Sequence, residues 1–204
     1  MDMDSTLINE EGIDLLAERL GVGKRVAEMT ATAMAGKSDF YSSLQARVSL
    51  LQDHPTEILA TVTASLSLTK GGPELIRSLQ DRGWMVAVVS GGFHEIIDDF
   101  LSPLHLDLIR ANRFDIQNGR FTGKVITPII GPKEKAETLI ELSQAHQIPK
   151  SRCIAIGDGA NDREMLQVAG IGIAFCAKDA LKRSAQIVID ERDLALVLEH
   201  IPAN

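Results

Sequence analysis

From Gly71 to the C-terminus, the chain alternates between helical patterns and short apolar stretches without a polar face. Strands that are apolar on both faces are typical of parallel sheets covered by helices on both sides. The alternation therefore predicts an α/β fold with a doubly wound parallel sheet. Asn118-Gly119 between alternating residues predicts a hairpin at about 114–121. The expected strands are 84–89, 153–156, 171–175 and 187–189, and the expected helices include 73–81 and 133–146.

Residues 10–67 lack this alternation and have an almost wholly helical pattern. Apolar residues recur there at the spacing of a helix face, as in Ile13, Leu16 and Leu20. A helical block between the first loop and the sheet is expected to form a separate cap. We therefore predict a core made of residues 1–9 and 68–204, with a helical cap insertion at 10–67.

Polar residues gather where the expected strands end. In open α/β sheets, ligands bind outside the carboxyl ends of the strands, where several loops meet. One shared site is therefore expected at that edge of the sheet. Its candidate members are Asp2 and Asp4 at the N-terminus, Ser90 and Gly91 after the strand at 84–89, and Asp158, Asn161 and Asp162 after the strand at 153–156.

These residue types suit phosphoryl transfer to a carboxylate. The reaction needs a nucleophile, neutralisation of charge on the phosphate oxygens, and a proton for the leaving oxygen. Asp2 is the candidate nucleophile, and Asp4 is the candidate general acid and later the base for water. Ser90 can bind phosphate through its hydroxyl, beside backbone N–H groups that Gly91 leaves accessible.

A positive charge and a metal ion complete the expected site. Lys133 and Lys135 both lie early in a helix, and spacing alone does not separate them as the group that neutralises the phosphoryl oxygens. Asp158, together with Asp2, supplies the hard oxygen ligands that Mg²⁺ requires. The other polar side chains of that turn can hold metal-bound water, the substrate or the lysine: Asn161 and Asp162.

Several segments of the chain resemble the haloacid dehalogenase superfamily and, within it, the phosphoserine phosphatases. The resemblance covers essentially the whole chain. The segments are DMDSTL at 2–7, AMAGKSDFYSSLQARVSLL at 33–51, VVSGGF at 88–93, GPKEKAETL at 131–139, IGDGANDREM at 156–165 and AFCAKDALK at 174–182.

The resemblance implies a role for each candidate residue. Asp2 is similar to the nucleophile of the family and Asp4 to its proton donor, and the family pattern favours Lys135 over Lys133. The implied Mg²⁺ ligands are Asp2, the backbone carbonyl of Asp4, and Asp158. The implied phosphate and substrate contacts are Ser90, Gly91, Lys135 and Asn161.

The resemblance also implies how an amino-acid substrate is recognised. Glu11 matches a residue that holds the ammonium group of phosphoserine, and Arg47 matches one that clamps its carboxylate with two bonds. Phe40 and Met34 resemble cap residues that cover the substrate and exclude water. The implied activity is hydrolysis of O-phospho-L-serine to L-serine and phosphate, the last step of serine biosynthesis.

The chain departs from the family pattern at its start. In the family an apolar strand ends at the nucleophile, whereas here only Met1 precedes Asp2. We therefore expect the usual first core strand to be missing, either because the sequence is a truncated copy of a longer chain or because the product lacks that strand. Two alternatives to the main hypothesis follow: a phosphatase or phosphotransferase of the same superfamily that acts on another small phosphomonoester, and a non-catalytic fragment.

Composition limits the partners. A net charge of −7 argues against a nucleic-acid partner, because phosphate backbones need clustered Lys and Arg. The sequence contains no apolar run of about 18 residues, so no membrane span is predicted. Cys153 and Cys176 both lie in apolar stretches and are expected to be buried and reduced, which favours the cytoplasm. We expect a small-molecule substrate and a monomer or homodimer.

Overall fold

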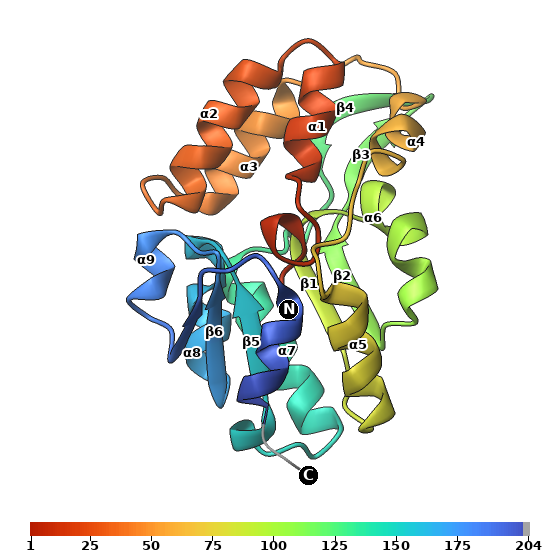
Figure 1. The fold of residues 1–204 in the computed structure, drawn as a ribbon. Coiled ribbons are helices and arrows are strands. Elements are labelled where there is room, and N and C mark those ends of the chain that lie inside the picture. The colour runs from red at the N-terminus through yellow and green to blue at the C-terminus, as the bar shows by residue number, and fades with distance from the viewer. Residues whose placement is uncertain (202–204) are drawn as a thin grey trace.

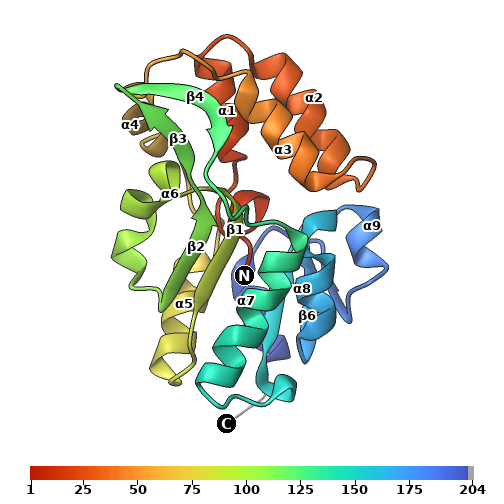
Figure 2. The ribbon, with the colours of Figure 1, turned by 180° about the vertical axis from the view of Figure 1, so that it is seen from behind.

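The computed structural model describes residues 1–201, and it has a helical upper part and a sheet-bearing lower part (Figure 1). Helix α5 covers one face of the parallel strands, and α7 and α8 cover the other (Figure 2). The predicted doubly wound α/β fold is confirmed. The helices are α1 (Gly12–Arg19), α2 (Gly23–Met34), α3 (Phe40–Ser49), α4 (Ile58–Thr63), α5 (Gly72–Asp81), α6 (His94–Leu101), α7 (Pro132–Ala145), α8 (Arg163–Val168) and α9 (Asp179–Lys182). The strands are β1 (Ala87–Phe93), β2 (Leu108–Asn112), β3 (Phe114–Gln117), β4 (Arg120–Val125), β5 (Ile154–Gly157), β6 (Ile171–Phe175) and β7 (Ile187–Ile189).

Strand β1 begins and ends later than the strand predicted at 84–89. Ala87 is its first residue paired with β2, and Phe93 is its last. The Ser-Gly-Gly segment that we expected to end the strand is part of it, with a shifted register against β2. Glycines permit such an irregularity because they have no side chain to place on the sheet. Strand β2 was not predicted from the sequence.

The parallel strands form two groups, β1–β2 and β5–β6–β7. Met1 and Asp2 lie between them. The α-amino group of Met1 donates to the Ala87 carbonyl at 2.7 Å, and the Val89 N–H donates to the Met1 carbonyl at 3.0 Å. On the other side, the Asp2 N–H donates to the Ile156 carbonyl at 2.9 Å. Within residues 1–201 no assigned strand lies between the two groups.

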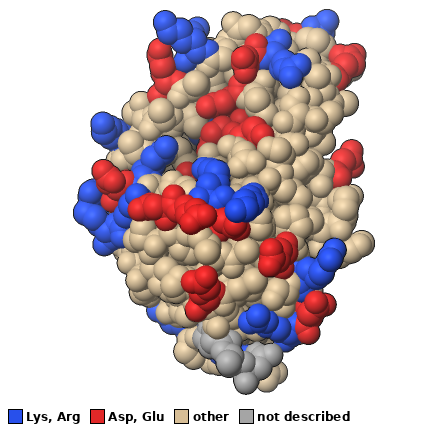
Figure 3. Space-filling model, in the orientation of Figure 1, with Lys and Arg blue, Asp and Glu red and all other residues tan. Residues whose placement is uncertain are grey.

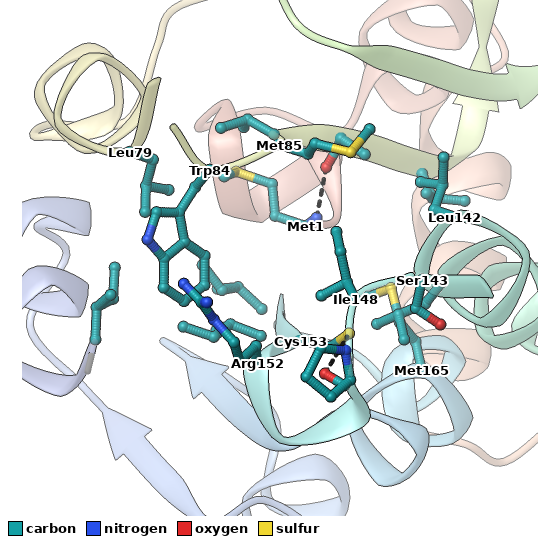
Figure 4. A pocket seen from close by; sticks show the side chains of 18 of the residues that line it. Met1, Leu79, Trp84, Met85, Leu142, Ser143, Ile148, Arg152, Cys153 and Met165 are labelled. Carbon is teal, nitrogen blue, oxygen red and sulfur yellow. Dashed lines mark hydrogen bonds between the residues drawn. The ribbon is translucent and has the colours of Figure 1, made fainter. Parts of the chain in front are cut away.

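A largely apolar cavity of about 350 Å³ lies between β1 and β5, next to Met1 (Figure 4). Trp84 forms part of its wall, and the Arg152 guanidinium lies 5.9 Å from the centre of the indole ring. Burial here lowers the pKa of the Met1 α-amino group from 8.0 to about 6.

The hairpin β3–β4 joins the helical upper part to the sheet. Phe114 on β3 stacks on Phe93 with ring centres 3.6 Å apart, and Phe121 on β4 meets Phe114 edge-on at 4.9 Å. The Asp53 N–H donates to the Phe121 carbonyl, which ties the loop after α3 to the hairpin. We use the word cap for α1–α4. The division into a core of residues 1–9 and 68–204 and a cap domain of 10–67 stays a prediction.

No helix within residues 1–201 is both long and apolar enough to cross a membrane. Cys153 and Cys176 are both free thiols, but each is half-buried and not buried as the sequence predicted.

Candidate active site

The first turn of the chain presents Asp2 and Asp4. It closes when the Ile8 N–H donates to the Met3 carbonyl at 3.0 Å, with Ser5 in the left-handed backbone region (φ 54°). Asp2 is buried, and its Oδ1 accepts the Met3 N–H at 2.7 Å. The turn therefore holds the Asp2 carboxylate in one orientation at the carboxyl ends of β1 and β5.

Lys135 on α7 lies between two carboxylates. Its Nζ is 2.6 Å from Asp2 Oδ1 and 2.8 Å from Asp162 Oδ1, and the side chain is completely buried. Burial alone would lower the pKa of Lys135, but the charges of Asp162 and Asp2 raise it above its ordinary value. Lys133 instead lies at the surface and pairs with Glu137 at 3.3 Å. The structure thus separates the two lysines that sequence spacing left equivalent.

The turn after β5 adds further side-chain oxygens. Asp162 Oδ2 accepts the backbone N–H groups of Asp158 and Gly159, both at 3.1 Å. Asp158 Oδ1 and Asn161 Oδ1 are buried without a hydrogen-bond partner in the part of the chain that the structure describes. Buried polar atoms ordinarily have hydrogen-bond partners, so these two oxygens are candidates for binding a ligand or metal ion.

The carboxylates of Asp2, Asp158 and Asp162 offer oxygens that all lie within 4.8 Å of one another. Burial, followed by the negative charge of Asp162, raises the pKa of Asp2 from 3.8 to about 7. The same two causes raise the pKa of Asp158 well above its usual range. A set of crowded, buried carboxylates with an unpaired oxygen fits a divalent cation, which would stabilise their ionised forms.

Asp4 faces the end of β1. Its Oδ1 accepts the Gly12 N–H at 2.7 Å, and its Oδ2 accepts the Ser90 hydroxyl at 3.1 Å. The Ser90 oxygen in turn accepts the Gly92 N–H at 2.8 Å. Burial raises the pKa of Asp4, although these hydrogen bonds act in the opposite direction. Asp4 is therefore suited to carrying a proton at a higher pH than an ordinary aspartate.

Asn112 at the end of β2 supports this edge of the site, and its role was not predicted from the sequence. Its side-chain amide donates to the carbonyls of Gly91 (2.9 Å) and Ile130 (3.2 Å), and its oxygen accepts the Ile130 N–H at 2.7 Å. It thereby fixes the backbone of Gly91, one of the predicted phosphate contacts. No sequence signal indicated Asn112, because β2 itself was not predicted.

Glu11 and Arg47 come from the cap side. Glu11 Oε1 accepts the Ser5 hydroxyl at 2.7 Å, and burial, followed by the charge of Asp4, raises the pKa of Glu11 to about 8. Arg47 is buried, which lowers its pKa, while the charges of Glu11, Asp14 and Asp4 oppose that change. The charge of Asp4 therefore affects the pKa values of both Glu11 and Arg47.

A relay that the sequence did not reveal orients Arg47. Its Nη1 donates to the Thr30 hydroxyl at 3.1 Å, and Thr30 donates to Asp14 Oδ1 at 2.6 Å. Its Nε donates to the Ser43 carbonyl one turn back on α3 at 3.3 Å. Three of the four cap helices, α1, α2 and α3, thus share in placing one guanidinium.

Phe40 and Met34 both lie over glycines of the core. A Cβ atom at Gly91 would lie 2.8 Å from Phe40 Cζ, and one at Gly159 would lie 2.9 Å from Met34 Sδ. The two side chains therefore close the site from above, and both glycines are needed for this close approach.

Figure 3 shows Lys and Arg interspersed with Asp and Glu on one face of the molecule, without a continuous basic stripe among the described residues. The large positive surfaces that bind nucleic acids are not seen on this face.

Comparisons with known proteins agree with this geometry. Residues 1–167 match the family model of haloacid dehalogenase-like hydrolases. The chain is 47% identical to a phosphoserine phosphatase of Lactococcus lactis over 98% of its own length and 93% of the relative's. It is 42% identical to one of Methanocaldococcus jannaschii, over 98% and 95%.

Solved structures give the same answer. A phospho-aspartyl intermediate analogue of phosphoserine phosphatase matches with a TM-score of 0.96 at 42% identity, over 98% of this chain and 96% of the other. A substrate-bound phosphoserine phosphatase complex matches with a TM-score of 0.96 at 41% identity, over the same shares of the two chains. The chain belongs to the haloacid dehalogenase-like hydrolases, in the branch formed by the phosphoserine phosphatases.

Proposed function

We propose that this chain hydrolyses O-phospho-L-serine to L-serine and phosphate, the last step of serine biosynthesis, through an aspartyl-phosphate on Asp2. The observation that carries the proposal is the contact of Asp2 with Lys135 beside the Asp158 and Asp162 carboxylates, with Asp4 two residues on. Phosphoserine phosphatases at 47% and 42% identity over nearly the full chain support the substrate.

The reaction has two steps. In the first, a carboxylate oxygen of Asp2 forms a bond to phosphorus, the bond from phosphorus to the serine oxygen breaks, and Asp4 gives its proton to that oxygen. In the second, Asp4 takes a proton from water, the water oxygen attacks phosphorus, and the bond to Asp2 breaks to release phosphate. Lys135 neutralises charge on the phosphoryl oxygens, and Ser90 and Gly91 hold them.

We propose Mg²⁺ as the cation, held by Asp2, Asp158 and the backbone carbonyl of Asp4. Hard oxygen ligands favour it, and when bound it neutralises charge on the phosphoryl group. Asp162 and Asn161 orient Lys135 and the substrate. We also propose that the enzyme works in the cytoplasm on this small-molecule substrate as a monomer or homodimer, without nucleic-acid or membrane partners.

Recognition of the amino-acid part falls to two cap residues. Arg47 clamps the substrate carboxylate, and Glu11 holds the ammonium, whose positive charge favours the ionised form of Glu11. Phe40 and Met34 exclude water once the substrate is bound. These four side chains reach the site from the cap side, while the phosphate contacts come from the core.

The test is phosphate release from phosphoserine in the presence of Mg²⁺. Asp2→Asn should abolish turnover. Arg47→Ala should raise the KM for phosphoserine at least tenfold (about 1.4 kcal/mol) and leave p-nitrophenyl phosphate hydrolysis nearly unchanged, because that compound has no carboxylate. Equal effects of Arg47→Ala on the two compounds would refute the substrate and favour another small phosphomonoester.

A further inference from the structure

Asp4 is half-buried, whereas three other side chains of the proposed site are almost completely buried. Asp2 is 2% exposed, Asp158 3% and Lys135 0%. Phe40 and Met34 of the cap lie directly against Gly91 and Gly159 of the core, so the cap is closed on the site in this arrangement. Contacts that exist only between cap and core in this arrangement therefore contribute to substrate affinity.

One such contact is made by two aromatic rings at the start of α3. Phe40 and Tyr41 pack edge-to-face, with ring centres 5.7 Å apart. A Cβ atom at Gly131 would lie 2.7 Å from Tyr41 Cε1, and one at Gly91 would lie 2.8 Å from Phe40 Cζ. Both rings thus rest directly on core backbone that has no side chains.

A hydrogen bond joins the start of α3 to the first turn of α7. The Tyr41 hydroxyl donates to Glu134 Oε2 at 2.7 Å, and that oxygen also accepts the Gly131 N–H at 3.0 Å. The Glu134 carboxylate therefore accepts two hydrogen bonds at the same time, one from the backbone at the start of α7 and one from Tyr41 of the cap. The next residue is Lys135, which holds Asp2 and Asp162.

We propose that Tyr41 and Glu134 form a latch, meaning a hydrogen bond that holds the cap closed and couples its closure to the placement of Lys135. The proposal rests on the phosphatase function proposed above. Both are positioning residues, since their hydrogen bonds go to each other and to the start of α7 rather than to the reacting groups.

The protonation states suit such a bond. Burial and the hydrogen bond to Glu134 raise the pKa of Tyr41 to about 12, so its hydroxyl keeps its proton at neutral pH. Partial burial opposes ionisation of Glu134, but the bonds from Tyr41 and from backbone N–H groups lower its pKa overall. A neutral hydroxyl facing a carboxylate makes a charge-assisted bond, which is stronger than one between neutral groups.

Kinetics of four variants test the latch. Tyr41→Phe keeps the ring and removes only the hydroxyl, and Glu134→Gln keeps an oxygen that can cap α7. We expect Tyr41→Phe to raise the KM for phosphoserine about three- to tenfold. The double variant should be no worse than Tyr41→Phe, because Glu134→Gln only weakens, by removing the charge, the same hydrogen bond that Tyr41→Phe already removes. Glu137→Gln, on the same helix and exposed, is the matched control and should leave kinetics unchanged.

Hydrogen–deuterium exchange provides a readout that does not need turnover. In Tyr41→Phe, with and without inorganic phosphate, backbone amides at 36–43 and 130–135 should exchange faster, while those of α6 and α8 should not change. If Tyr41 had a purely structural role, its substitution would instead speed amide exchange throughout the core.

The outcomes separate the two proposals. Unchanged KM and unchanged exchange in Tyr41→Phe, or strictly additive effects in the double variant, would overturn the latch. If even the unmodified chain does not hydrolyse phosphoserine, the proposed function fails, and the exchange measurement alone then confirms or overturns the latch.

Discussion

We expect the acidic cluster to make the stability of the fold depend on pH and on a divalent cation. Asp2, Asp158 and Asp162 crowd three carboxylates around the single ammonium group of Lys135. Burial and the charge of Asp162 raise the pKa of Asp2 from 3.8 to about 7. Because one pKa unit corresponds to about 1.4 kcal/mol, keeping Asp2 ionised in the folded chain costs about 4 kcal/mol when no cation is bound.

The direction in which stability changes with pH follows from the linkage between proton binding and folding. Since the pKa of Asp2 is higher in the folded than in the unfolded chain, its contribution to stability is fully present below about pH 3.8 and is lost as the pH rises through about 7. The proposed Mg²⁺ would bind the ionised carboxylates, so it would compete with protons at pH 5.5 and much less at pH 7.5. At about 100 times its Kd, a ligand stabilises by about 2.7 kcal/mol, which for a chain of this size raises Tm by about 5–10 °C.

The assay is a thermal melt with Mg²⁺ or EDTA at both pH values. We expect the full shift of about 5–10 °C at pH 7.5 and less than about half of it at pH 5.5. Asp158→Asn removes a proposed ligand and one buried charge, so in EDTA it should melt no lower than the unmodified chain, and it should not respond to Mg²⁺. Asp190→Asn, at a surface ion pair with Lys182, is the control and should respond fully. Equal Mg²⁺ shifts at the two pH values, or a full shift in Asp158→Asn, would refute the reasoning.

Three further predictions follow from packing. Lys135→Met leaves Asp2 and Asp162 buried without their cation and should lower the free energy of unfolding by about 3–5 kcal/mol in urea melts; a loss below about 1 kcal/mol would contradict this. Phe114→Ala removes the ring between two others and should cost about 3–5 kcal/mol by the same measurement, more than any exposed substitution. Gly91→Ala puts a methyl group against Phe40 and should lower kcat/KM for phosphoserine, with partial recovery when Phe40→Leu is added; no recovery would mean that the ring is not the obstacle.

Secondary structure was predictable where the pattern is local. The helices at 73–81 and 133–146 match α5 and α7 closely, because helical periodicity and the flanking Pro and Gly residues act within a few residues. Strand β1 was misplaced by several residues, and β2 was missed. An apolar run marks burial, whereas the ends of a strand depend on which backbone groups find a partner on the neighbouring strand.

The site was predictable in its residue types and only partly in its partners. The two lysines on α7 show the difference: two positions along a helix point about 200° apart, so Lys135 enters the core while Lys133 faces solvent. Asn112, the Thr30–Asp14 relay behind Arg47, and the bond from Tyr41 to Glu134 all join residues distant in sequence. No local pattern encodes such pairs.

The sequence by itself determined the class of fold and the chemistry at the strand ends, because alternating apolar periodicity and short motifs such as Asp2-Met3-Asp4 and Gly157-Asp158-Gly159 carry that information in neighbouring residues. Only the tertiary structure decided which charges meet. Burial and distance set the pKa values of Asp2, Asp4 and Glu11 and the pairing of Lys135, and both quantities arise from contacts that form when the whole chain packs.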